Sequence, residues 1–150
     1  QYFNHDSVFF IGRNVDYALG LEGSLKLKEI SYIHSEAYAS GELKHGTISL
    51  IEDGTLVVAL GTYGRLFEKA MSNVVEVKSR GADVLALTTD SHREEMGRTA
   101  DAVVTIPDIH ELMLPSLGVV PLQLFAYYVA LMRGCDIDKP RNLAKSVTVE

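Results

Sequence analysis

Four short, mostly apolar runs divide the chain into alternating segments. The runs lie at Ser7–Gly12, 55–60, 83–88 and Ala102–Ile106, and turn-forming or charged residues separate them. Within each run the apolar residues follow one another directly and do not occupy only every second position. Runs of this length and composition predict β-strands that are buried on both faces of a sheet.

The segment after the first run carries the spacing of a helix. Apolar residues recur at intervals of three and four from Asp16 to Ala37, and the Ser40-Gly41 pair interrupts the pattern. This spacing predicts one long helix before the break, with His34 along it as a structural residue.

Two further helices complete the pattern. An amphipathic segment at 65–80 is terminated by Gly81, and an apolar segment begins at Pro115 or Pro121 and runs to Gly134. Strands that alternate with helices predict a doubly wound α/β domain, in which helices flank a parallel sheet. We find no repeat or linker, so residues 1–150 are expected to form one domain. Ligands of such sheets bind at the carboxyl ends of the strands.

Composition narrows the class of protein. The chain has 150 residues, of which 47% are apolar, as expected for a globular domain. Its 14 basic residues are scattered among 20 acidic ones, and this net charge of −6 argues against a nucleic-acid surface. The lone Cys135 excludes an internal disulfide and favours a reducing compartment. No apolar run is expected to reach the length of a membrane span, and we expect a cytoplasmic location.

The long predicted helix carries a candidate catalytic pair. Lys26 and Glu29 are three residues apart and therefore lie on one face, which Glu22 shares. A carboxylate held by an ammonium group in a cleft moves a proton between adjacent carbons, while the cation steadies the developing enolate charge. The alternative interpretation is a solvated ion pair of little energetic value.

His45 is the candidate acid or base among the five histidines. It lies in the polar turn 42–46, where an imidazole has accessible nitrogens that can transfer protons. The cluster of His92, Glu94 and Glu95 is interpreted as a solvated charged loop, so no metal site is predicted.

The last fifteen residues contain more conformationally restricted and hydrogen-bonding residues than a usual chain end. Pro140 restricts the backbone, Arg141 and Asn142 offer hydrogen bonds, and Lys145 precedes the β-branched run Val-Thr-Val. Such a segment can cover a pocket with one amine directed inward. A neutral lysine amine forms a Schiff base with a carbonyl group. The alternative is a solvated lysine on a frayed tail.

Two separated strings carry a family resemblance. Residues 21–46 read LEGSLKLKEISYIHSEAYASGELKHG, and residues 136–150 read DIDKPRNLAKSVTVE. Both resemble the carboxyl-terminal sugar isomerase (SIS) domain of the glucosamine-6-phosphate synthase family, the glutamine:fructose-6-phosphate amidotransferases. The resemblance implies a parallel sheet flanked by helices, with residues 1–150 as the second SIS domain of an isomerase unit and residues 134–150 as a tail over the active site.

The resemblance also implies roles for the candidate residues. In the family, the glutamate at the position of Glu29 moves the proton between the first two sugar carbons, and the lysine matching Lys26 supports the enolic intermediate. The histidine matching His45 opens the sugar ring and comes from the partner subunit of a homodimer, so we expect its turn to project from the strand-end cleft that Glu29 faces. The lysine matching Lys145 forms the Schiff base. The implied substrate contacts are Glu22, Arg141, Asn142 and Ala144.

The family's full enzyme makes glucosamine 6-phosphate from fructose 6-phosphate and glutamine, the first step of amino-sugar biosynthesis, without a cofactor or metal. The present sequence departs from the family in three places. It lacks the glutaminase cysteine, residues 12–16 are not the Ser/Thr-rich loop that holds the sugar phosphate in the sister SIS domain, and Thr47 replaces a proline.

The resemblance therefore implies half of an isomerase unit. Its expected partners are a phosphosugar, the sister SIS and glutaminase domains of a longer chain, and a second subunit; no nucleic-acid or membrane partner is expected. By itself the chain is expected to be inactive as a synthase. The alternative function is a non-catalytic SIS module that binds a phosphosugar and reports its level to a partner.

Overall fold

A five-stranded parallel sheet forms the centre of the computed structural model, which describes residues 2–143. The strands pair in the order β2-β1-β3-β4-β5, and every neighbouring pair is parallel. The predicted α/β class with a parallel sheet flanked by helices is confirmed. The strands are β1 (Ser7–Gly12), β2 (His34–Ala39), β3 (Leu56–Gly61), β4 (Asp83–Thr89) and β5 (Ala102–Ile106).

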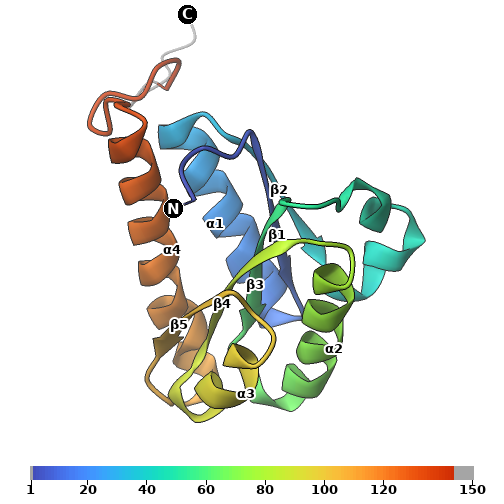
Figure 1. Ribbon diagram of the computed structural model, residues 1–150. Coiled ribbons are helices and arrows are strands. Elements are labelled where there is room, and N and C mark those ends of the chain that lie inside the picture. Colours follow the sequence, from blue (N-terminus) through green and yellow to red (C-terminus); the bar gives the residue numbers. More distant parts are fainter. Residues whose placement is uncertain (1, 144–150) are drawn as a thin grey trace, which may run out of the picture.

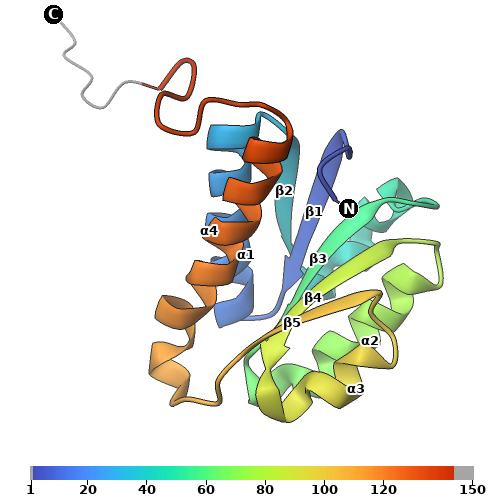
Figure 2. The ribbon, with the colours of Figure 1, turned by 60° about the vertical axis from the view of Figure 1, so that its left-hand side comes forward.

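Helices cover both faces of the sheet (Figures 1 and 2). The helices α1 (Val15–Ser31) and α4 (Leu114–Met132) lie side by side on one face. The other face is covered by α2 (Phe67–Lys78), the short helix α3 (Arg93–Gly97) and the 3-10 helix η1 (Ser40–His45). Each face has its own apolar core, because successive residues of a buried strand point to opposite sides.

Small residues set the close packing of α1 on α4. A Cβ atom added at Gly118 of α4 would lie 2.6 Å from Cδ2 of Leu19, and one added at Gly23 of α1 would lie 2.9 Å from Cδ1 of Leu122. A larger side chain at either position would require the facing leucine side chain to move. The two helices are therefore closely packed at these positions.

The long predicted helix is confirmed up to Ser31 and wrong beyond it. Helix α1 ends at Ser31, because Tyr32 adopts the left-handed conformation with φ 62°. The chain then turns back as β2, an edge strand that pairs with β1 from His34 onward. Consequently His34 begins a strand and is exposed, contrary to the predicted structural role in a helix.

The apolar helix α4 begins before Pro115, which occupies its first turn, while Pro121 lies inside it. By length and composition alone, the segment Glu111–Met132 is apolar enough to cross a membrane, with a mean hydropathy of 1.5, which corrects the expectation that no apolar run reaches that length. One side of this helix packs into the core with α1. Its other side is also apolar and remains exposed.

Candidate functional site

Three charged side chains form a connected group on α1. The Nζ atom of Lys26 donates a hydrogen bond of 2.9 Å to Oε2 of Glu29 and lies 3.5 Å from Oε1 of Glu22. About two thirds of the Lys26 and Glu29 side-chain surfaces are covered, so this pair is less solvated than an ordinary surface pair. The predicted common face of these residues is confirmed.

The Lys26 ammonium is stabilised in its charged form. Its hydrogen bond to Glu29 raises the pKa of Lys26 above the ordinary lysine value, although partial burial acts in the opposite direction. Lys26 therefore stays protonated at neutral pH and is suited to steady negative charge. Because imine formation needs a neutral amine, this environment favours a charge-stabilising role for Lys26 over attack on a carbonyl.

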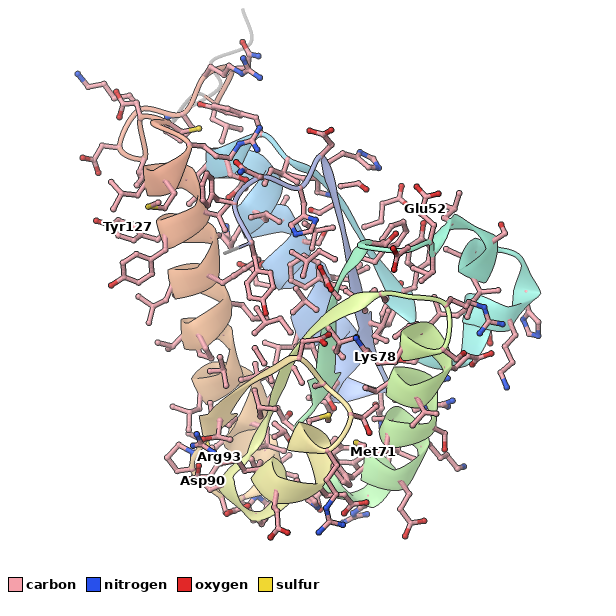
Figure 3. All side chains as sticks on the ribbon, in the orientation of Figure 1. Glu52, Met71, Lys78, Asp90, Arg93 and Tyr127 are labelled. Atoms are coloured by element: carbon pink, nitrogen blue, oxygen red, sulfur yellow. The ribbon has the colours of Figure 1, made fainter. Side chains whose placement is uncertain are left out.

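A hollow of about 430 Å³ opens next to this group, between α1 and α4. Lys26 and Ile30 line it from α1, and Val120, Leu124 and Tyr127 line it from α4. Figure 3 shows Tyr127 projecting from the outer side of α4. The hollow thus combines one cation with a mainly apolar wall.

The expected position of Glu29 at the carboxyl ends of the strands is wrong. Helix α1 starts after the carboxyl end of β1 and runs back along the sheet, and Glu29 lies in its last turn. Glu29 is therefore close to the end of the sheet at which β1 and β2 begin. The strand-end cleft that Glu29 was expected to face is not beside it.

His45 lies at the end of η1, on the opposite face of the sheet. Its neighbour Leu43 packs into the core that α2 covers, whereas Leu27 of α1 packs into the core of the other face. The His45 side chain is 72% exposed, and its Nδ1 lies 2.7 Å from Oε2 of Glu42. Within one chain, therefore, the structure does not bring His45 and Glu29 together.

The beginning of the tail docks on the end of α1. The backbone N–H of Arg141 donates a 2.9 Å hydrogen bond to Oη of Tyr32, and its guanidinium lies 4.0 Å above the centre of the Tyr32 ring. Tyr32 is three residues from Glu29, so the tail approaches the Lys26–Glu29 pair. Asn142 follows with φ 63°, while Ala144 and Lys145 lie outside the described residues.

Sequence reasoning missed Tyr32, which anchors this contact. The only local signal is an aromatic residue just after the last turn of a helix, and such residues are common. It also missed Gln123 and Tyr127 of the hollow, because they belong to a helix that was interpreted only as apolar. Among residues 2–143, no group of three or more His, Cys, Asp or Glu side chains is placed to hold a metal ion.

A buried carboxylate links α1 to the loop after β3, at the point where the strand order reverses between β1 and β3. Asp16 is 2% exposed and accepts hydrogen bonds from the backbone N–H groups of Thr62 and Tyr63 at 3.0 and 3.1 Å, and from the Thr62 hydroxyl. Burial raises the pKa of Asp16, and these hydrogen bonds offset the effect only in part. Doubly wound sheets bind ligands at this end of the sheet, and a hollow of about 220 Å³ lined in part by Thr62 and Tyr63 opens there.

We expect Asp16→Ala to lower the free energy of unfolding by about 2–4 kcal/mol, because two buried N–H groups lose their acceptor. Chemical denaturation with a fixed m-value is the measurement. The matched control is Asp90→Ala at an exposed position, which Figure 3 labels, and its effect should stay within about 0.5 kcal/mol. Equal effects of the two variants would show that Asp16 does not anchor the loop after β3.

Comparison with known proteins defines the class. The family model of the SIS domain matches residues 1–133, and the chain belongs to this family. It is 58% identical over 146 residues to the isomerizing glutamine–fructose-6-phosphate aminotransferase of Clostridium acetobutylicum, and 59% identical over 150 residues to that of Caldanaerobacter subterraneus. These alignments cover 97% and 100% of the chain but 24% of each relative, so the chain spans about a quarter of their length.

Solved structures agree with this assignment. The C-terminal domain of glucosamine-fructose-6-phosphate aminotransferase from Francisella tularensis superposes with a TM-score of 0.86 at 37% identity, over 92% of this chain and 39% of that one. A glucosamine-6-phosphate deaminase from Thermotoga maritima gives a TM-score of 0.75 at 32% identity, over 97% of this chain and 41% of that one. The resemblance to the SIS domain of the synthase family and the predicted fold class are thus confirmed.

Proposed function

We propose that this chain is the second SIS domain of an isomerizing glutamine–fructose-6-phosphate aminotransferase, and that it carries the proton-transfer residues of the isomerase site. The observation that supports this most strongly is the Lys26–Glu29 pair, whose 2.9 Å contact lies beside a hollow. High identity to relatives of that name over nearly the whole chain supports the proposed substrate class.

The proposed chemistry begins with ring opening of fructose 6-phosphate by His45. The Lys145 amine then forms an imine with the carbonyl at carbon 2, whose oxygen leaves as water, and ammonia displaces the lysine to leave the imine of ammonia. Glu29 takes a proton from carbon 1, the electron pair of that C–H bond forms a double bond between carbons 1 and 2, and the imine nitrogen takes up a proton. Glu29 then returns its proton to carbon 2, and the carbon 1 hydroxyl loses its proton as the aldehyde forms. The product is glucosamine 6-phosphate, which is an aldose.

Lys26 has a separate role in this scheme. Because its pKa is raised by Glu29, it remains a cation and stabilises the negative charge that develops in the enolic intermediate. It also holds the Glu29 carboxylate in one position. The two lysines of the proposed site thus have different roles. Lys145 forms the imine, which needs a neutral amine, and Lys26 stabilises charge, which needs an ammonium group.

An exposed apolar stripe supports the proposal that the site is completed by further protein. Val120, Leu124, Tyr127 and Leu131 recur along α4 at intervals of four, three and four residues, and each is 42–51% exposed. The first three of them also line the hollow beside Lys26, so protein bound to the stripe would cover that hollow. Contiguous exposed apolar surface of this kind is typical of an interface. We assign the sister SIS domain to this stripe, because the relatives are about four times as long as this chain.

The relatives are long enough to contain a glutaminase domain in addition to the region that matches this chain, and we propose that domain as the source of ammonia. We also propose that His45 of each subunit contributes to the site of its partner in a homodimer. The position of His45 supports this, since His45 lies on the opposite face of the sheet from Glu29. A cytoplasmic location, where both sugar phosphate and glutamine are present, belongs to the same proposal.

In the full-length enzyme, Lys145→Arg should abolish imine formation, because a guanidinium stays protonated and cannot attack a carbonyl. Borohydride reduction in the presence of fructose 6-phosphate, followed by peptide mass mapping, measures the trapped imine. Lys28→Arg, at an exposed position of α1, is the matched control and should leave trapping unchanged. Sugar found on another lysine would contradict the assigned role, and sugar binding without any turnover in the unmodified enzyme would favour a non-catalytic module.

A further inference from the structure

A second hollow lies on the face of the sheet opposite to the Lys26–Glu29 pair. It has a volume of about 250 Å³ and opens between η1 and the outer side of α2. Arg13 lines it from the loop after β1, Lys44 from η1 and Lys69 from α2. None of these three residues belongs to the isomerase site proposed above.

The charge of this hollow is opposite to that of the chain. Three cations line it with a single carboxylate, Glu76, whereas the whole chain carries a net charge of −6. Glu76 is shared with residues on both sides, since Lys44 lies 3.7 Å and Arg80 3.8 Å from its two oxygens. The single carboxylate therefore neutralises the hollow only in part.

The guanidinium of Arg13 is held in place before any ligand arrives. Its Nε atom donates a 3.0 Å hydrogen bond to Oδ1 of Asn73, which is 3% exposed and therefore fixed by its surroundings. On its other side Arg13 packs against Gly41, where an added Cβ atom would lie 3.2 Å from Nη1. A larger residue at position 41 would displace the guanidinium.

Within residues 2–143, neither Nη atom of Arg13 forms a hydrogen bond or an ion pair. These two atoms form the planar fork with which arginine binds two oxygens of one anion. Lys44 and Lys69 add flexible point charges around the fork. A fixed fork surrounded by mobile cations is the arrangement expected for a tetrahedral anion.

We propose that this hollow binds the phosphate group of a small phosphate monoester, with Arg13 as the bidentate ligand. The three cations exceed the charge of Glu76 by two. A doubly charged phosphate therefore gains more electrostatic energy in this hollow than a singly charged carboxylate ligand would. The volume leaves space beyond the phosphate for the rest of a small metabolite. Binding bridges η1 to α2 through Lys44, and Lys44 directly precedes His45.

The test is a titration of the 150-residue chain followed by amide NMR at constant ionic strength, with inorganic phosphate, glycerol 3-phosphate and acetate as separate probes. We expect saturable shifts at Arg13, Gly41 and Lys44 with glycerol 3-phosphate, and at least about tenfold weaker binding in Lys69→Gln, which changes an exposed residue, and in Arg13→Gln. Arg93→Gln, labelled in Figure 3 on α3, is the matched control and should bind normally.

Several outcomes would overturn the proposal. Non-saturable binding would do so, and so would equal weakening by Arg93→Gln and Lys69→Gln, since either result indicates only general attraction to positive charge. Acetate binding as tight as that of glycerol 3-phosphate would assign the hollow to carboxylates. Binding of inorganic phosphate without the ester would overturn the metabolite assignment. Glu29→Gln should leave this binding unchanged, and a loss in that variant would place the ligand at the isomerase site instead.

Discussion

Replacing Glu29 by glutamine in the full-length enzyme should reduce isomerisation by at least about a hundredfold, the usual scale for loss of a general base. The amide has nearly the same shape as the carboxylate and still accepts a hydrogen bond from Lys26, so the 2.9 Å contact of the pair can be kept. It cannot take up a proton from carbon 1. Substrate affinity should therefore change little while the turnover number falls.

The measurement is steady-state turnover together with exchange of the hydrogen at carbon 1 with solvent, because exchange reports the proton-transfer step itself. Glu68→Gln, at an exposed position of α2, is the matched control and should retain normal turnover. If carbon 1 continues to exchange at the normal rate in Glu29→Gln, a different residue is the base. A large rise in the Michaelis constant with unchanged turnover would instead assign Glu29 to binding.

The buried strands were predictable because each is an apolar run with turn-forming residues around it. Strand β3 is buried at every position, so its signal is unambiguous. The edge strand β2 gave no such signal, since its sequence HSEAYA is mostly polar and only Ser35 is fully buried. Apolar residues on both sides of Tyr32 continue the helical spacing. The left-handed conformation that ends the helix occurs at Tyr32 and not at a glycine, so the sequence carries no usual stop signal there.

The candidate pair was predictable for a local reason. Lys26 and Glu29 are three residues apart on a helix, and that spacing alone places them on one face. Their position in the fold was not predictable, because it depends on where α1 ends and on the direction in which it crosses the sheet. Contacts such as Arg141 on Tyr32, and Arg13 on Asn73, join residues far apart in sequence and leave no local pattern.

The position of His45 leads to the most specific claim about the active site. Because His45 and Glu29 lie on opposite faces of one chain, we propose that each site takes Glu29 from one subunit and His45 from its partner. A heterodimer of a Glu29→Gln subunit and a His45→Ala subunit then has one site with both defects and one site with none. Half of the dimers are heterodimers after equal random mixing, so about a quarter of all sites should be intact.

The decisive measurement is the activity of such a mixture of full-length subunits after subunit exchange has been verified by mass spectrometry of differently tagged chains. Each variant alone should be nearly inactive, and the mixture should recover about a quarter of the wild-type activity. Mixing Glu29→Gln subunits with Glu29→Gln, His45→Ala double-variant subunits is the control, which should recover nothing. Activity that never rises above that of the two single variants would contradict the account, because it would mean that His45 and Glu29 act from the same chain.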